Sequence, residues 1–279
     1  MDTYLKQLQA ILDGGTVRGD RTGIGTISLF GLNARYKMED GFPAVTTKKL
    51  AWKVMSSELL WFISGSTNIN DLKAIYQQNK IWDANYKDYA TRLGLDLQDG
   101  DMGRVYGSQW RRWKTTDGYE IDQLAEAIDL ITTNPNSRRI IVNAWNPGEA
   151  STNKVALPPC HTFFQFYVSN EKLSLHMYQR SADMFLGVPF NIASYSLLLH
   201  MIAKITGLQA YEFIHTIGDA HIYLDAVEQA KEQISRSPLP LPSLNIKDRG
   251  QKKIDDFEMN DFSLKDYQCH KAIKAMMAV

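Results

Sequence analysis

The sequence predicts a single α+β domain, and three observations support this class. A chain of 279 residues, 44% of them hydrophobic, can bury one large core. Helical and strand-like apolar patterns both occur, and they do not alternate regularly as in α/β folds. Neither internal repeats nor a low-complexity linker interrupts the chain, so we expect residues 1–279 to form one domain.

Helices are predicted over residues 2–13, 56–63, 121–132, 192–205 and 221–235. The first has apolar residues at helical spacing and stops at two glycines. The segment 192–205 has few charges, so we expect a helix that is buried on nearly all sides and forms the spine of the core. Asn191 precedes this segment and is expected to act as its N-cap.

Strands are predicted over residues 26–37, 139–145, 162–168 and 173–178, where apolar residues run together or alternate. Residues 169–172, with the sequence Ser-Asn-Glu-Lys, separate the last two strands. Because this short polar segment is typical of a turn, we expect the two strands to form a hairpin.

Charge and cysteine content restrict the class of protein. The 31 Lys and Arg residues balance 31 Asp and Glu residues, which argues against a broad nucleic-acid surface. Cys160 and Cys269 are too few for a disulfide framework and favour a reducing cytoplasm. No N-terminal segment resembles a signal peptide, and no apolar run approaches the roughly 20 residues that span a bilayer. We expect a soluble cytoplasmic protein.

Cys160 and Arg180 are the most informative residues of the chain. Cys160 follows two prolines at the start of one predicted strand, and Arg180 lies at the end of the next. A thiol with a reference pKa of about 8.5 ionises more readily beside a guanidinium group. This pair predicts covalent chemistry on an anionic substrate, with Arg180 both activating the thiol and binding the substrate. The alternative is a small buried cysteine without chemistry.

The adjacent Cys160 and His161 also suggest a hydrolase. Neighbouring side chains of a strand point to opposite faces, so these two should not touch. None of the local signatures of cysteine proteases surrounds Cys160. A remote base such as His221 keeps this as a weak alternative.

Short segments along most of the chain stand in the order of the motifs of one known family. They are Asp20-Arg21-Thr22-Gly23, Thr46-Thr47-Lys48-Lys49, Glu58-Leu59-Leu60-Trp61-Phe62, Ile81-Trp82-Asp83, Val105-Tyr106-Gly107, Ser137-Arg138-Arg139-Ile140-Ile141, Ala144-Trp145-Asn146-Pro147, Pro159-Cys160-His161, Tyr178-Gln179-Arg180-Ser181, Gly187-Val188-Pro189-Phe190-Asn191-Ile192-Ala193-Ser194-Tyr195 and Gly218-Asp219-Ala220-His221-Ile222-Tyr223. The chain resembles the thymidylate synthases over residues 21–279. The resemblance implies a large twisted mixed β-sheet flanked by helices, and a homodimer packed sheet to sheet.

The resemblance also implies a methyltransferase of dTMP biosynthesis. It would convert dUMP to dTMP with 5,10-methylenetetrahydrofolate as donor of both the one-carbon group and the hydride, leaving dihydrofolate. The family needs no metal, and no second His or Cys stands at metal-ligand spacing here. The alternative is a dUMP hydroxymethylase, in which water quenches the same methylene intermediate. That choice depends on water exclusion around Trp82 and the C-terminal tail.

Four residues would carry the chemistry. Cys160 would add to the pyrimidine as a thiolate and convert the ring into an enolate-like nucleophile. Glu58 lies among apolar residues, where desolvation would raise its pKa and suit it to general acid and base catalysis. Tyr106 would help to remove the ring proton. Asn191 would pair with the amide edge of uracil, whereas cytosine-specific relatives are expected to have Asp there.

A larger set of residues would bind dUMP. The set is Arg21, Arg138, Arg139, Gln179, Arg180, Ser181, Asp183, Asn191, His221 and Tyr223. Guanidinium groups suit a phosphate dianion, and Arg138 and Arg139 would come from the other subunit. His221 and Tyr223 share a face of an extended segment and would bind the sugar hydroxyl.

The folate would be bound by a partly overlapping set: Lys48, Trp82, Asp183, Leu186, Gly187, Phe190, Tyr223 and Ala278. Asp183 would accept hydrogen bonds from the pterin, and Lys48 would meet the polyglutamate tail. Ala278 belongs to the C-terminal tail, which closes over the site in the family.

Some features depart from the family or allow another interpretation. Arg104 stands where most members have proline, and Asn85 replaces a second tryptophan of some members. The cluster Trp110-Arg111-Arg112-Trp113 could stack on bases, which leaves an RNA-binding protein as a remote alternative.

Overall fold

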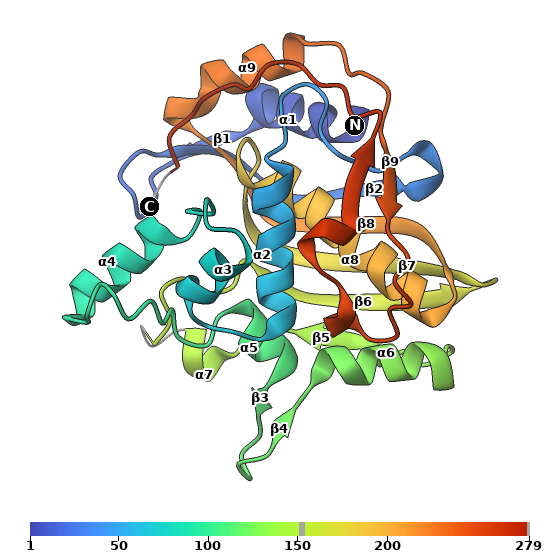
Figure 1. Ribbon diagram of the computed structural model, residues 1–279. Helices are drawn as coiled ribbons and strands as arrows, with labels where there is room; N and C mark the ends of the chain where they lie inside the picture. Colours follow the sequence, from blue (N-terminus) through green and yellow to red (C-terminus); the bar gives the residue numbers. More distant parts are fainter. Residues whose placement is uncertain (151–153, 278–279) are drawn as a thin grey trace.

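A six-stranded mixed sheet forms the centre of the computed structural model, which describes residues 1–150 and 154–277 (Figure 1). In spatial order its strands are β1 (Thr16–Arg18), β2 (Thr26–Lys37), β8 (Gln209–Tyr223), β7 (Lys172–Asp183), β6 (His161–Ser169) and β5 (Ile141–Asn143). The β7–β8 pair is parallel and the other neighbours are antiparallel. The α+β class and the mixed sheet are therefore confirmed.

Helices and two small hairpins surround this sheet (Figure 1). The helices are α1 (Asp2–Gly14), α2 (Trp52–Ser64), α3 (Ile69–Ile75), α4 (Asp83–Leu93), α5 (Tyr106–Arg111), α6 (Gln123–Thr133), α7 (Pro147–Ala150), α8 (Gly187–Thr206) and α9 (Val227–Ser235). Short 3-10 turns are η1 (Met38–Asp40), η2 (Leu224–Ala226), η3 (Ile254–Asp256) and η4 (Met259–Asp261). The hairpins pair β3 (Trp113–Lys114) with β4 (Glu120–Ile121), and β9 (Ser243–Ile246) with β10 (Phe262–Lys265).

The two faces of the sheet have different surroundings. On β6, Phe164 and Phe166 point into the core and are each 1% exposed. Phe163 and Tyr167 alternate with them and are 39% and 67% exposed. The inner face packs against α8, while the outer face of this single chain leaves aromatic side chains in solvent. An exposed apolar sheet face is unusual for a monomer.

Helix α8 is the buried spine of the core, as predicted, but it begins earlier than expected. It starts at Gly187, so Asn191 lies inside the helix and the N-cap prediction is wrong. The carboxylate of Asp183 accepts hydrogen bonds from the backbone amides of Phe185 and Leu186, which shapes the turn that leads into the helix. Pro189 fits the first turn because its missing amide would have no helical partner there. Among the described residues, α8 alone is long and apolar enough to span a bilayer, and most of it is buried in this core.

Other boundaries shift where strand pairing or side chains decide them. The helix predicted over 221–235 is α-helical only over Val227–Ser235, after the 3-10 turn η2, because pairing with β2 extends β8 to Tyr223. The strand predicted over 139–145 is limited to Ile141–Asn143. Helix α6 begins after Asp122, whose carboxylate caps it by accepting from the amide of Ala125. The turn at 169–172 is confirmed.

Helices α2 and α5 approach closely at Gly107. A Cβ atom on Gly107 would lie 2.2 Å from the carbonyl oxygen of Phe62. This contact also brings the ring of Tyr106 onto that of Phe62, with centroids 4.7 Å apart. Gly107 therefore sets the distance between the helices that carry Glu58 and Tyr106.

We predict that Gly107→Ala destabilises the protein, because the methyl group would collide with backbone rather than with a movable side chain. The expected loss is about 1–3 kcal/mol in the free energy of unfolding, measured by urea denaturation. Gly14→Ala is the matched control, since nothing lies within 4 Å of its added Cβ. Equal stability of the two variants would contradict the close helix contact.

Candidate active site

Two hollows meet at Cys160. The first has a volume of about 400 Å³ and a polar wall that includes Arg21, Arg180, Ser181, Asp183, His221 and Tyr223. The second has a volume of about 350 Å³ and a largely apolar wall that includes Phe62, Trp82, Leu186, Gly187, Phe190 and Met277, with Glu58, Tyr106, Gln179 and Asn191 beside them. Cys160, Ser181 and Asp183 line both. Most of the predicted site residues are thus brought together around the thiol.

Arg180 holds the segment that carries Cys160. Its guanidinium group donates to the carbonyl oxygens of Pro158 and Pro159, at 2.9 Å each. The same group lies 3.8 Å from Cys160 Sγ. The backbone amide of Arg180 donates to the carbonyl of Cys160 at 2.9 Å, which joins β7 to the start of β6. The thiol and the cation are therefore held at adjacent strand ends, as the sequence predicted.

The ionisation of Cys160 reflects two opposed effects. Burial raises the pKa of the thiol above its ordinary value. Arg180 lowers that pKa, and so does the hydroxyl of Tyr106. Arg180 thus lowers the pKa of the thiol as expected, but in the free chain burial raises this pKa by more. The thiol is therefore protonated at neutral pH before substrate binds.

Glu58 is buried on α2, and within the described part of the chain its carboxylate accepts one hydrogen bond. The indole Nε1 of Trp82 donates to Glu58 Oε1 at 2.8 Å. Burial raises the pKa of Glu58 to about 7, and the Trp82 hydrogen bond opposes this only in part. The raised pKa expected from the apolar sequence around Glu58 is confirmed, and it suits proton exchange near neutral pH.

Tyr106 opens α5 and its hydroxyl accepts a hydrogen bond from the backbone amide of Cys160 at 2.8 Å. Burial raises the pKa of Tyr106 well above its ordinary value, so its hydroxyl stays neutral. This places a neutral O–H group next to the nucleophile.

His161 is not suited to act as a base for Cys160. Its ring packs on those of Tyr106 and Tyr195, with centroids 5.1 and 5.2 Å away. Burial lowers the pKa of His161 to about 3, so it is a weak base. His221 does line the polar hollow, with Nδ1 3.2 Å from Asp219 Oδ1. Within residues 1–150 and 154–277, neither His161 nor His221 makes a hydrogen bond to Cys160, so the geometry does not favour the hydrolase interpretation.

Gln179, Asp183 and Tyr223 complete the wall around the thiol. Gln179 is 3% exposed and donates from Nε2 to the carbonyl oxygen of Ser181 at 3.0 Å. Burial raises the pKa of Asp183, against the effect of the two backbone amides that it accepts from. Burial, and then the charge of Asp183, raise the pKa of Tyr223 to about 12.

Lys48, Arg138 and Arg139 do not line either hollow. Lys48 is 7% exposed, with Nζ against the carbonyl oxygen of Phe185 and 3.6 Å from the centroid of that ring. Burial lowers the pKa of Lys48 to about 8. Arg138 and Arg139 are exposed before β5, and Ala278 lies outside the described residues.

Some residues of the walls were not assigned from the sequence. Arg18 and Asn85 line the polar hollow, and Asp219 joins them there. Asp219 pairs with Arg18 at 3.3 Å and with His221. Asp219 belongs to the segment Gly218-Asp219-Ala220-His221-Ile222-Tyr223, so its place two residues before His221 could have indicated a role in the site.

Two members of the cluster Trp110-Arg111-Arg112-Trp113 are engaged within the protein, which does not favour the base-stacking interpretation. Trp110 is 1% exposed and packs on Phe164 in the core. Arg111 pairs with Asp122 at 2.9 Å and with Asp255 at 2.6 Å. These side chains anchor α5 to its neighbours and are not free to stack on a base.

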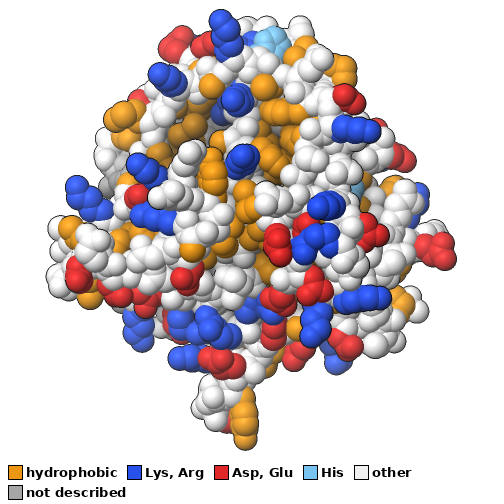
Figure 2. Space-filling model, viewed as in Figure 1, with side chains coloured by type: hydrophobic (Ala, Val, Ile, Leu, Met, Phe, Trp, Pro, Cys, Tyr) orange, Lys and Arg blue, Asp and Glu red, His pale blue; other side chains and the backbone are white. Residues whose placement is uncertain are grey.

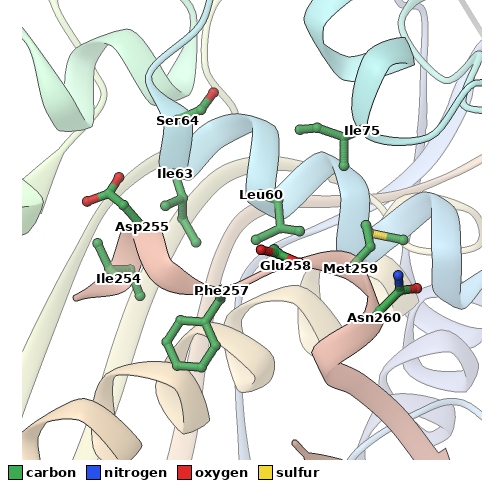
Figure 3. Close-up of a pocket in the computed structure, with 10 residues that line it drawn as sticks. All are labelled: Leu60, Ile63, Ser64, Ile75, Ile254, Asp255, Phe257, Glu258, Met259 and Asn260. Carbon is green, nitrogen blue, oxygen red and sulfur yellow. The ribbon is translucent and has the colours of Figure 1, made fainter. Parts of the chain in front are cut away.

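A further hollow of about 410 Å³ lies apart from Cys160, between α2, α3 and the turns η3 and η4 (Figure 3). Its wall is mainly apolar, with Leu60, Ile63 and Phe257 near one another. No cysteine or histidine lines it. Figure 2 shows that hydrophobic side chains also gather in a depression higher on this face, with Lys or Arg side chains among them.

Within the described ranges, no group of three or more His, Cys, Asp or Glu could hold a metal ion.

Comparison with known proteins agrees with the site. The sequence profile of the thymidylate synthase family matches residues 2–279. A thymidylate synthase of Homo sapiens is 51% identical over 99% of this chain and 90% of its own length. Thymidylate synthases of Listeria innocua and Listeria monocytogenes are each 47% identical over the full length of both chains.

The profile covers nearly all of the chain, and the relatives are similar over at least 90% of their lengths. Together with the thiol, the buried carboxylate and the two hollows, this similarity shows that the chain belongs to the thymidylate synthase family.

Proposed function

We propose that this protein converts dUMP to dTMP in the cytoplasm. When bound, 5,10-methylenetetrahydrofolate would supply the one-carbon group and the hydride. The observation that carries the proposal is the position of Cys160 between a polar hollow, whose wall includes Arg18, Arg21 and Arg180, and an apolar, aromatic one. The first suits a nucleotide monophosphate and the second suits a flat pterin.

Cys160 and Glu58 divide the chemistry. As the ring binds, Cys160 would release its proton to water and add to the pyrimidine as a thiolate, so that a carbon–sulfur bond forms while the ring C=C bond opens to an enolate. Glu58, with a pKa of about 7, would exchange protons with the ring. Tyr106 would assist removal of the ring proton, and Asn191 would pair with the uracil amide edge. These roles are supported by the shared wall around Cys160.

The phosphate of dUMP would meet Arg21, Arg180 and Ser181, with His221 and Tyr223 on the sugar. These residues line one polar hollow. The second group of guanidinium donors would come from the partner subunit's Arg138 and Arg139, because both are exposed in the single chain. Gln179 and Asp183 would complete the nucleotide side.

The pterin would stack in the apolar hollow against Trp82, Leu186, Gly187 and Phe190. Asp183 would accept hydrogen bonds from its amino edge, near Tyr223. Met277 already lines this hollow, which supports closure by the tail and exclusion of water. Ala278 would take part in the closed tail. Lys48 would have to turn outward from Phe185 to meet a glutamate tail.

Mass analysis of the product tests the proposed reaction. Purified protein is incubated with dUMP and 5,10-methylenetetrahydrofolate, and the nucleotide is then identified. A methylated nucleotide with dihydrofolate is expected. A hydroxymethylated nucleotide, heavier by one oxygen atom, would instead show that water quenches the intermediate, and unchanged dUMP would reject both.

We predict that Cys160→Ala abolishes turnover but leaves dUMP binding, because the thiol forms a bond and the phosphate is held by arginines. Activity assays and calorimetry with dUMP measure the two effects. Cys269→Ala is the control and should keep activity, because Cys269 lines neither hollow. Wild-type activity in Cys160→Ala would end the nucleophile assignment.

Glu58 should make stability fall as pH rises. Its pKa is about 7 in the folded protein and 4.5 in its ordinary state, so between these values the folded protein keeps a proton that the unfolded chain has lost. The folded state therefore loses roughly 3 kcal/mol of stability as pH increases across this range. Glu58→Gln should remove this loss, and its Tm should exceed that of the wild type at pH 8 but not at pH 4.

Glu126→Gln, on the exposed side of α6, is the control and should leave the pH dependence of Tm unchanged. The same Glu58→Gln variant should lose most of its turnover. Parallel Tm curves of Glu58→Gln and the wild type from pH 4 to 8 would contradict the raised pKa.

We infer a homodimer whose subunits pack through the exposed aromatic face of the sheet. Phe30, Phe163 and Tyr167 are all large and exposed on the single chain, which supports burial of this face by a second copy. Such packing would allow Arg138 and Arg139 to reach the site of the partner.

Mixed subunits test the shared site. Cys160→Ala and Arg139→Ala subunits are each expected to be inactive, and their hybrid should recover activity because one of its two sites carries neither defect. Labelled chains verify subunit exchange, and wild-type subunits mixed with Cys160→Ala provide the upper limit of activity. Verified exchange without recovery would mean that each subunit holds a complete site.

A further inference from the structure

A buried histidine outside the proposed chemistry contacts the wall of the active site from behind. His215, on β8, is 0% exposed. Its Nε2 lies 2.9 Å from Gln179 Oε1 on β7. Gln179 lines the apolar hollow beside Cys160, and its own Nε2 donates to the carbonyl oxygen of Ser181.

The hydrogen bonds that link His215, Gln179 and Ser181 allow one assignment of donors and acceptors. The Ser181 carbonyl oxygen can only accept, so the NH₂ group of Gln179 must face it. The carboxamide oxygen of Gln179 then faces His215, and Nε2 of His215 must carry the proton. Burial, with smaller contributions from His161 and His176, lowers the pKa of His215 to about 3, so the ring is neutral and has one N–H to donate.

The sheet holds the histidine ring in this orientation. Gln179 is beside Ile217 in the parallel β7–β8 pair, and His215 is beside Met177, so the two polar residues are diagonal neighbours on the inner face. The ring of His215 stacks on Phe213, with centroids 5.5 Å apart and planes 29° apart. Because Met177 and Phe213 are fully buried, the ring is fixed by packing as well as by its hydrogen bond.

Ser181 connects this chain of contacts with the nucleotide. It follows Arg180 directly and lines both hollows around the thiol. The carbonyl of Ser181 is held by Gln179, so the direction of the carboxamide influences where the Ser181 hydroxyl and the neighbouring guanidinium group lie. A carboxamide without its donor would be free to rotate and to expose its oxygen to the site.

We propose that His215 is a positioning residue, which holds the Gln179 carboxamide by donating from Nε2 and thereby orders the wall that binds the nucleotide. The inference rests on the proposed function for the identity of that nucleotide, dUMP. His215 does not line either hollow around the thiol, and it acts through Gln179.

The test compares dUMP binding by full-length variants with the same overall fold. His215→Phe keeps an aromatic ring for Phe213 but lacks the donor, and its dissociation constant for dUMP should rise about tenfold by calorimetry. His215→Gln can present an amide N–H near the position of Nε2 and should restore binding to within about threefold of the wild type. His200→Phe is the matched control, since His200 on α8 packs on Phe42 away from the site, and it should bind dUMP as the wild type does.

A double-mutant cycle separates positioning from a general effect on packing. In a Gln179→Leu background, His215→Phe should change dUMP binding by less than twofold, because the group it orients is gone. Wild-type binding by a folded His215→Phe, a Gln variant no better than the Phe variant, or a full tenfold effect in the Gln179→Leu background would each overturn the proposal.

The wild-type protein offers a measurement that needs no variant. Nitrogen-15 NMR of the imidazole at pH 7 should show His215 neutral and protonated on Nε2, and protonation on Nδ1 would overturn the proposed hydrogen bond. If the wild type does not bind dUMP, the proposed function fails, while this spectrum still decides the role of His215. If the wild type binds dUMP and the variants are unaffected, only the inference about His215 fails.

Discussion

The hydrogen bonds between Arg180 and the segment before β6 are the interaction on which the rest of the site depends. The guanidinium group holds the carbonyls of Pro158 and Pro159, and the backbone amide of Arg180 holds that of Cys160. Because these bonds join the ends of two adjacent strands, the thiol cannot move independently of the sheet. A cation that is already satisfied by protein oxygens also stays in place beside Cys160, where it can meet a phosphate without a large rearrangement.

Burial controls the ionisation of the groups around this anchor. It raises the pKa values of Cys160 and Glu58 and lowers that of His161, so in each case the neutral form is favoured. A site of this kind avoids the cost of buried charge before substrate binds. The reactivity of these groups therefore depends on bound substrate, because its phosphate dianion changes the charge of the site and its planar ring displaces water from the two hollows.

Much of the fold and site could be predicted from local patterns. The apolar run 192–205 predicted the central helix, and the segment 162–178 predicted the β6–β7 hairpin, because burial periodicity is a property of the sequence itself. The predicted boundaries failed at Asn191 and at residues 221–226 for other reasons. At α8 the reason is a local turn, because the carboxylate of Asp183 accepts from the amides of Phe185 and Leu186 just before the helix. At β8 the reason is pairing with β2, which is distant in sequence.

Local sequence was sufficient to predict the chemical groups of the site: a thiol after two prolines, a cation one strand later and a carboxyl group in an apolar helix. Their electrostatic state depends on the assembled fold, because burial of Cys160 outweighs Arg180, and depth cannot be read from neighbouring residues. The assembled fold also decided that Trp110 packs in the core and that Lys48 lies over Phe185. Side-chain exposure results from contacts between distant segments, and these exist only once the sheet and its helices have assembled.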